Sequence, residues 1–426
     1  MKRKSLLVCS ILSLLLSAVS PCLRAQNSGF VYLSNSPSNA NQPGSILGYA
    51  VSDDTGALTA VPGSPFQIQL SGGGSSLAVT PSGRFLYTPT ATYSASTGTY
   101  SVFVVAYSID ASSGALTPVP GSPFYAEANS PGINWLTMDP AGKFLYAMNT
   151  YFAEIFVYSI DQNTGALTLQ PSSPFPTQQG YPAILTLGAT GQFAYVTYAA
   201  RSGSFNGAIS AYRIDLTNGS FTVVPGSPFM IPNDPSSANK NGPNPTWAAA
   251  HPSAGFLYVA DSNQLDLWTF TIDGTSGALT LSPSSPMQMP HGSNQFAIDP
   301  TGSFAYFTTL YPNSTDCAIY YPYTNVYAPD SVFVYSIDQA SGALSPASSP
   351  VAAAGYQPVP VATDPSGRFA YALNLQGYNF DPSSSNISAY RIHGESGRLT
   401  PVLGSPFPAG VNAAPTLVVA AAQNKN

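Results

Sequence analysis

The sequence predicts an all-β fold, a seven-bladed β-propeller of four-stranded blades, and two repeated motifs carry this prediction. The first motif is an apolar strand that ends in Ile-Asp or a close variant, followed by a Gly turn and a polar strand that closes on Ser-Pro-Phe. It occurs seven times, at residues 48–66, 106–124, 157–175, 211–229, 269–287, 334–351 and 389–407. Repeats of this length that contain only strands are typical of propeller blades.

The second motif is a tight turn followed by Phe-x-Tyr, and it lies out of phase with the first. It occurs at residues 81–87, 140–146, 189–195, 252–258, 300–306 and 365–371, each time after a short apolar run. Glycine in such a turn adopts a positive φ without steric cost, as a hairpin requires. Each blade is therefore expected to hold an apolar inner strand, the Phe-x-Tyr strand, the strand that ends in Ile-Asp and an outer polar strand.

The two ends of the chain carry incomplete copies that complement each other. Residues 30–32 form a Phe-x-Tyr strand with no inner strand before it, and residues 416–420 form an apolar run with nothing after it. We therefore expect one blade to be split, with the C-terminal strand paired beside residues 29–34. This pairing closes the ring and leaves no free sheet edge.

Residues 1–25 have the features of a secretory signal peptide. Three basic residues at 2–4 precede an apolar run at 6–19, and cleavage is expected near Ala25. The apolar run is too short to span a membrane comfortably, and no other stretch is long enough. We therefore expect a secreted or periplasmic protein. Lipid anchoring at Cys22 is the less favoured alternative, because a proline directly precedes that cysteine.

The mature chain, residues 26–426, is expected to be a single propeller domain with a net negative charge. The full chain has 13 Lys and Arg and 19 Asp and Glu, of which the signal holds four basic and no acidic residues, so the mature charge is 9 − 19 = −10. This charge argues against nucleic acid as a partner. The low charge content of 8% suits a neutral small molecule, a carbohydrate or a protein. Cys317 is the only mature cysteine, so we expect no intrachain disulfide. No metal-ligand spacing or phosphate loop is present, so we expect no metal or cofactor, and we expect a monomer.

The binding site is expected on the face of the ring that carries loops of varying length, because function usually lies in variable loops on a rigid scaffold. These loops are 34–44, 88–100, 199–207, 229–246, 308–330 and 375–386. Loop 308–330 is rich in tyrosine. It forms either an aromatic lid over the channel or a packed surface excursion, and the sequence leaves both open.

Six residues near the starts of inner strands are the ligand-binding candidates, because these positions point at the channel mouth. They are Asn134, Trp135, Tyr181, Trp247, Asn294 and Gln295. Tryptophan supplies flat apolar area and amides supply directed hydrogen bonds, a combination that suits a sugar or another neutral ring. The alternative is that both tryptophans pack between blades and plug the mouth.

Catalytic candidates are scarce. His251 and His393 occupy positions at which other repeats carry a structural Asp, which leaves His291 as the one histidine outside the repeat pattern. Arg201 could reach inward from its loop. Four repeats carry Asn or Asp three residues after the Tyr of Phe-x-Tyr, at Asn35, Asn149, Asp261 and Asn374. This repetition favours turn capping over ligand binding.

The inner hairpin, the Ile-Asp-x-x-x-Gly-x-Leu unit and Ala-Tyr-Val-Thr at 194–197 resemble the seven-bladed propeller lactonase family, which includes 6-phosphogluconolactonase, and the related secreted YVTN-repeat proteins. The resemblance covers the mature chain. It implies catalysis by a His just before an inner strand and a Glu after a Phe-x-Tyr strand. The positions of that His hold Ser76, Trp135, Ile184, Trp247, Gln295 and Pro360, and those of that Glu hold Ser36, Ala91, Thr150, Ala199, Ser262, Leu310 and Leu375.

Because neither catalytic group is retained, the sequence favours a binding or scaffold protein that uses the variable-loop face. The alternative is a lactone hydrolase of the 6-phosphogluconolactonase type, a carboxylic ester hydrolase in which His291 and Arg201 would act. Convergence of these two residues with an acidic group at the channel mouth would favour the hydrolase.

Overall fold

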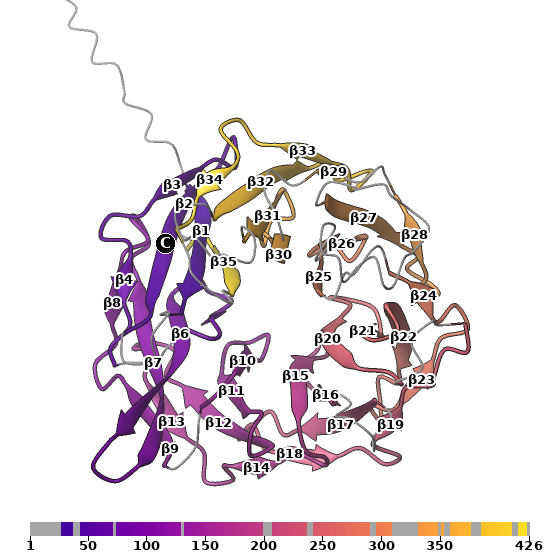
Figure 1. Cartoon of the computed structure of the whole chain (residues 1–426), viewed down its shortest axis with the longest axis horizontal. Helices are drawn as coiled ribbons and strands as arrows, with labels where there is room; N and C mark the ends of the chain where they lie inside the picture. Colours follow the sequence, from indigo (N-terminus) through magenta and orange to yellow (C-terminus); the bar gives the residue numbers. More distant parts are fainter. Residues whose placement is uncertain are drawn as a thin grey trace, which may run out of the picture.

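The computed structural model is a ring of seven antiparallel sheets (Figure 1), which confirms the predicted all-β, seven-bladed propeller. It describes residues 27–36, 43–70, 74–128, 132–198, 207–236, 242–289, 295–308, 331–347, 351–352, 358–375, 385–410 and 416–423. No helix occurs in these ranges. Between neighbouring sheets lie clusters of buried apolar side chains, so the core is divided into layers around the ring.

Blades 1 to 4 are made of the following strands. Blade 1 holds β1 (Asn27–Asn35), β2 (Ser45–Ser52), β3 (Leu58–Ala60), β4 (Phe66–Gln67) and β35 (Leu417–Ala421). Blade 2 holds β5 (Ala78–Val79), β6 (Phe85–Ser94), β7 (Thr99–Ile109), β8 (Leu116–Pro118) and β9 (Phe124–Ala128). Blade 3 holds β10 (Trp135–Met138), β11 (Phe144–Asn149), β12 (Glu154–Ile160), β13 (Leu167–Leu169) and β14 (Phe175–Pro176). Blade 4 holds β15 (Pro182–Leu187), β16 (Phe193–Tyr198), β17 (Ala208–Ile214), β18 (Phe221–Val223) and β19 (Phe229–Met230).

Blades 5 to 7 follow the same plan. Blade 5 holds β20 (Pro245–Ala250), β21 (Phe256–Asp261), β22 (Asp266–Ile272), β23 (Leu279–Leu281) and β24 (Met287–Gln288). Blade 6 holds β25 (Gln295–Ile298), β26 (Phe304–Thr308), β27 (Ser331–Ile337), β28 (Leu344–Pro346) and β29 (Val351–Ala352). Blade 7 holds β30 (Pro358–Thr363), β31 (Phe369–Asn374), β32 (Asn386–Ile392), β33 (Leu399–Pro401) and β34 (Phe407–Pro408).

The outer strand of each blade differs from the prediction, because it is broken into two short pieces that both pair with the third strand. In blade 3, β13 and β14 both pair with β12. The break falls at Ser-Pro, where proline has no N–H to continue the ladder. The serine hydroxyl supplies the missing partner: the Val157 amide donates to Ser173 Oγ at 2.7 Å, and the Ala211 amide donates to Ser227 Oγ at 2.9 Å. This contact explains why Ser-Pro-Phe recurs.

Blade 1 is split between the two ends of the chain, as predicted. β35 pairs antiparallel with β1, with Gly29 opposite Ala421 and Leu33 opposite Leu417. The Ser34 amide extends the pairing by donating to the Thr416 carbonyl at 3.0 Å. The ring therefore closes through backbone hydrogen bonds between segments that are almost 400 residues apart.

The two sequence motifs meet across each interface between blades. The Tyr hydroxyl of Phe-x-Tyr donates to the carbonyl of the turn Gly in the next blade, as in Tyr32 to Gly114 at 2.7 Å. The same contact occurs at Tyr87, Tyr195, Tyr258, Tyr306 and Tyr371. The Phe ring lies under the same Gly: a Cβ at Gly277 (φ +80°) would approach Phe193 Cδ1 to 2.2 Å. Only glycine fits there, because both the positive φ and the ring exclude a side chain.

Two faces of the ring can now be distinguished. The turn face carries the turns between the first and second and between the third and fourth strands of each blade. The loop face carries the links between the second and third strands and between blades.

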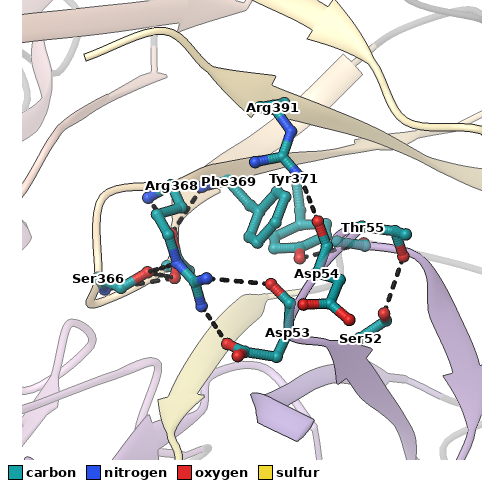
Figure 2. Close-up of polar contacts among 11 residues, drawn as sticks. Ser52, Asp53, Asp54, Thr55, Ser366, Arg368, Phe369, Tyr371 and Arg391 are labelled. Carbon is teal, nitrogen blue, oxygen red and sulfur yellow. Dashed lines mark hydrogen bonds and ion pairs between the residues drawn. The ribbon is translucent and has the colours of Figure 1, made fainter. Parts of the chain in front are cut away.

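Arginines reinforce the turn face where blade 7 meets blade 1 (Figure 2). Arg368 forms an ion pair with Asp53 and donates to the Asp53 carbonyl at 3.0 Å, while Arg391 donates to the Asp54 carbonyl. Both guanidinium groups lie over the Phe369 ring. The ion pair is solvent-exposed and contributes little alone, so the main role of these arginines is to cap backbone carbonyls of the neighbouring turn.

Candidate functional site

Two tryptophans line the loop-face end of the channel and contact each other. Trp135 begins β10 and Trp247 lies in β20, with blade 4 between them. Their rings meet edge to face, with centroids 5.4 Å apart. Each indole N–H donates to a backbone carbonyl of the next blade, Trp135 to Leu185 at 2.8 Å and Trp247 to Phe296 at 2.9 Å. Both side chains are half-buried.

These contacts combine features of both sequence interpretations. The indole N–H groups hold neighbouring inner strands together, which is a packing role. The half-buried ring surfaces remain accessible from the channel and offer apolar area of the kind that stacks on a sugar ring. Binding over Trp135 and Trp247 therefore stays a prediction.

The structure describes three other candidates, each at or directly before the start of an inner strand. The Asn134 side-chain carbonyl accepts from the Thr150 hydroxyl at 2.9 Å. Tyr181 precedes β15, is 45% exposed and has a positive φ of 61°, a strained conformation of a kind that is common at binding sites. Gln295 begins β25, and its side-chain oxygen is buried without a hydrogen-bond partner among the described residues.

Several residues named by the sequence lie outside the described residues, among them the candidates Arg201, His291 and Asn294 and the cysteines Cys22 and Cys317. The tyrosine-rich loop falls there as well, except for Thr308. Their predicted roles stay predictions.

The two described histidines have structural roles, as predicted. His251 is fully buried, and its Nδ1 accepts from the amides of Ser253 and Ala254 at 3.2 and 2.8 Å. Its Nε2 therefore carries the proton and donates to the Gly302 carbonyl at 2.9 Å. In blades 3, 6 and 7 an Asp carboxylate caps the same turn. The imidazole ring of His393 pairs with the Thr400 hydroxyl at 3.1 Å.

Two of the four residues at the repeated Asn and Asp position, Asn149 and Asp261, cap turns on the loop face, in line with the favoured interpretation. Asn35 and Asn374 instead donate to side chains of the neighbouring third strand. Asn149 Oδ1 accepts from the Tyr151 amide at 3.0 Å. Asp261 Oδ1 accepts from the Asn263 amide at 2.9 Å and from the Asn244 amide at 2.8 Å. Asp261 thus also anchors the segment that leads into Trp247.

A cluster of three buried carboxyl groups lies on the loop face of blade 5, and sequence reasoning missed it. Asp261 and Asp266 are cross-strand partners and are fully buried, and Asp234 reaches them from the link between blades 4 and 5. Gln288 Nε2 donates to Asp266 Oδ1 at 2.7 Å, and Ser236 donates to both oxygens of Asp234. The sequence did offer one indication of this cluster: Asp261 and Asp266 lie on either side of one short turn, in a chain with few charged residues.

This cluster holds a proton near neutral pH. Burial raises the pKa of Asp266 to about 7, and the nearby Asp234 and Asp261 carboxylates add to the rise, against the Gln288 hydrogen bond. Burial also raises the pKa of Asp261, against the opposing effect of its backbone amide donors. No group of three or more His, Cys, Asp or Glu within the described ranges is arranged to hold a metal ion.

Charge is divided between the two faces. Every Lys and Arg in the described part of the chain lies at the turn face; they are Arg84, Lys143, Arg213, Arg368, Arg391 and Arg398. Four described carboxyl groups, those of Glu154, Asp234, Asp261 and Asp266, lie at the loop face. The described loop face therefore carries no basic group that could hold a phosphate.

Comparison with solved structures finds the same fold in bacterial proteins. A periplasmic gluconolactonase of Pseudomonas aeruginosa is 16% identical, with a TM-score of 0.62 over 92% of this chain and 99% of that one. A candidate 6-phosphogluconolactonase of Bacteroides fragilis is 15% identical, with a TM-score of 0.62 over 92% of this chain and 98% of that one. A similar protein of Bacteroides uniformis is 13% identical, with a TM-score of 0.63 over 92% and 100%. At these identities the likeness shows the fold alone.

No curated protein sequence matches this chain. No described segment forms a helix that is long and apolar enough to cross a membrane. The profile of the family described as "Lactonase, 7-bladed beta-propeller" matches residues 14–309, which is more than half of the chain. This match agrees with the repeated motifs and with the seven observed blades, and the chain therefore belongs to the family of seven-bladed β-propeller lactonases.

Proposed function

We propose that the protein hydrolyses an unphosphorylated sugar lactone at the loop-face mouth of its channel. The distribution of charged residues between the two faces of the ring is the observation that favours an unphosphorylated substrate. All described cations lie at the turn face, and the charged groups of the described loop face are carboxyl groups. A phosphorylated lactone needs Arg or Lys clamps, and the described loop face offers none. The basic residues of the remaining loop-face segments are Arg201, which we assign below to the carbonyl oxyanion, and Lys240.

Trp135 and Trp247 are proposed to hold the lactone ring. Their half-buried edge-to-face rings supply apolar surface, and the half-buried Gln295 side chain at the start of β25 is proposed to hydrogen-bond a sugar hydroxyl. Family membership and the fold shared with a periplasmic gluconolactonase support lactone chemistry.

Hydrolysis requires water to add to the lactone carbonyl and the ring C–O bond to break, which yields a hydroxy acid. We assign the proton-accepting role to His291 and stabilisation of the carbonyl oxyanion to Arg201, the only histidine and arginine in the loop-face segments of the sequence. These roles rest on sequence position.

The test is a pH-stat assay of glucono-δ-lactone and 6-phosphogluconolactone, corrected for spontaneous opening. We expect a higher kcat/KM for the unphosphorylated lactone. His291→Ala should lower kcat about 10²-fold or more, and Trp135→Ala with Trp247→Ala should raise KM in a protein that still folds. His251→Ala is unsuitable as an activity probe, because that ring is part of the fold.

A second function, recognition of a neutral ligand without turnover, is favoured by one observation. The described positions that correspond to the family's catalytic His hold Ser, Trp, Ile, Gln and Pro. Binding of a sugar or lactone that depends on both tryptophans, without hydrolysis of any lactone, would establish this function in place of the first.

We further propose that the protein acts outside the cytoplasm as a monomer, after cleavage near Ala25. The basic and apolar pattern of residues 1–25 and the periplasmic location of one structural neighbour support this. Mass spectrometry of the exported protein tests it by locating the mature N-terminus, and a lipid on Cys22 would contradict it.

A further inference from the structure

The second and third strands of blade 2 form a hairpin that is longer than in any other blade. β6 and β7 contain 10 and 11 residues, and they pair without interruption from Phe85 opposite Ser108 to Ser94 opposite Thr99. In blades 3 to 7 the corresponding strands contain five to seven residues. The tip of the hairpin reaches the periphery of the ring (Figure 1). Blade 2 thus carries an extension that closure of the propeller does not need.

Exposed aromatic side chains concentrate in blades 2 and 3. Six aromatic side chains are exposed in the described part of the chain, and five of them belong to blades 2 and 3: Tyr93, Tyr100, Tyr125, Tyr151 and Phe152. Tyr93 and Tyr100 are cross-strand partners at the hairpin tip, with ring centroids 4.7 Å apart. Exposure of several large rings in one region of a surface is typical of a binding site.

The tyrosine pair faces the neighbouring blade. Side chains alternate along a strand, so Tyr100 lies on the same side of β7 as Val102 and Val104. These two valines pack in the cluster between blades 2 and 3, together with Phe156 of blade 3. Tyr93 and Tyr100 therefore lie on the face of the hairpin that is turned toward blade 3, beyond the buried core.

The neighbouring blade 3 carries further exposed aromatic side chains at the loop face. Its turn at the loop face carries Tyr151, 61% exposed, and Phe152, 47% exposed. Glu154 begins β12 on the same side of the strand as Phe156, so its carboxyl group also points toward blade 2. Glu154 Oε2 is buried and has no hydrogen-bond partner among the described residues.

We propose that this surface, built from Tyr93, Tyr100, Tyr151, Phe152 and Glu154, binds an uncharged polysaccharide chain. Exposed tyrosine and phenylalanine rings offer flat apolar area for the C–H faces of successive sugar rings. The Glu154 side chain as a whole is half-buried, and its carboxyl group is proposed to accept a hydrogen bond from a sugar hydroxyl, as a polar anchor in an aromatic site.

The absence of charged residues on the hairpin favours a neutral polysaccharide as the ligand. The whole stretch from Phe85 to Ile109 contains no charged residue, and its tip consists largely of Ser, Thr, Gly and Tyr. An anionic polymer would find only the Glu154 carboxylate, which repels it. A neutral glycan therefore fits this surface better than a polyanion. The proposal does not depend on the lactone site, because none of these residues lies on an inner strand.

Affinity electrophoresis tests the proposal directly. The full mature protein is run through gels that contain soluble β-glucan, galactomannan or xylan, with polygalacturonate as the anionic contrast. We expect retardation by at least one neutral polymer and none by polygalacturonate. The double variant Tyr93→Ala/Tyr100→Ala should weaken this binding about tenfold or more, Tyr151→Ala should weaken it severalfold, and Glu154→Gln should have the smallest effect.

The control variant is Leu403→Ala, since Leu403 is 93% exposed and lies in blade 7 between β33 and β34. It should bind as the wild type does, and matching melting temperatures will show that all variants fold. The proposal is overturned if no neutral polymer retards the wild type, or if the tyrosine variants bind unchanged. It is also overturned if the tyrosine change only abolishes a dimer seen by sedimentation, because the surface then joins two copies of the chain.

Discussion

Replacing Asp266 with Asn should stabilise the protein at alkaline pH and have little effect at pH 4. The Asp266 carboxyl group is fully buried, and burial raises its pKa from 3.8 to about 7. Between these two values the folded state keeps a proton that the unfolded chain has already released. The free energy of unfolding therefore falls as the pH rises from about 4 to about 7.

The size of this effect follows from the shift. Each pKa unit corresponds to about 1.4 kcal/mol, so the buried Asp266 costs roughly 4 kcal/mol once the pH exceeds 7. Asparagine removes the titration and keeps the shape. Its side-chain oxygen can still accept from Gln288, and its NH₂ group can donate to Asp234, as the protonated carboxyl group does. At pH 4 we therefore expect a change within about 1 kcal/mol.

Urea unfolding at pH 4 and pH 8 measures the difference, with Asp273→Asn as the matched control. Asp273 is exposed, and the Ser276 amide and hydroxyl and the Thr275 amide lower its pKa. That carboxylate stabilises the fold above its unfolded pKa, so its removal should destabilise the protein at pH 8, opposite in sign to Asp266→Asn. If Asp266→Asn shows the same pH dependence as the wild type, or loses stability at both pH values, the proton is not held at Asp266.

Three further predictions concern stability. Removal of the chain from Thr416 onward should abolish cooperative thermal unfolding or lower the melting temperature sharply. Burial of Leu417 alone contributes about 1.5–3 kcal/mol, and β1 loses its hydrogen-bonded neighbour. An unchanged melting temperature would refute closure by this strand. Tyr32→Phe removes the hydrogen bond to the Gly114 carbonyl and should lower the free energy of unfolding by about 1 kcal/mol. Tyr146→Phe should not lower it, because the Tyr146 hydroxyl has no partner in the described structure. Equal losses in urea unfolding would contradict the role of the interblade bond. Thiol titration of the mature protein should find one group, Cys317, and a reducing agent should leave the melting temperature unchanged; a count of two would show that Cys22 is retained.

The repeats made the architecture predictable, because the same residues recur wherever the same contact is made. Phe-x-Tyr and the Gly turn lie in different parts of each repeat, and their equal number indicated seven units. Their direct contact could not be read from the sequence, since Tyr32 and Gly114 belong to different blades and are 82 residues apart. The break in the outer strand was also missed, because a polar stretch does not show that Ser64 bonds to the Gly48 amide.

The candidate site was predictable only in part. Position in the repeat placed Trp135 and Trp247 on inner strands, but their mutual contact depends on how far blade 4 separates two strands in space. The carboxyl cluster follows no repeat, because Asp234 comes from a link between blades that has its own length and conformation. A motif search detects residues that recur, and these residues do not.

Residues that depart from the repeat pattern are therefore the candidates for functions specific to this protein, whereas the repeated residues maintain the propeller fold. The contacts between neighbouring blades use Phe, Tyr and Gly in nearly every blade, and arginines of blades 2, 4 and 7 add to them at the turn face. The loop face is free of that requirement. The tryptophan pair, the carboxyl cluster and the long hairpin of blade 2 all lie at loop-face positions where one blade differs from the others. The carboxyl cluster and the long hairpin make no contact that closes the ring, so substitutions there should change pH response or binding while the fold survives. The tryptophans also join neighbouring inner strands, so their replacement should cost some stability as well.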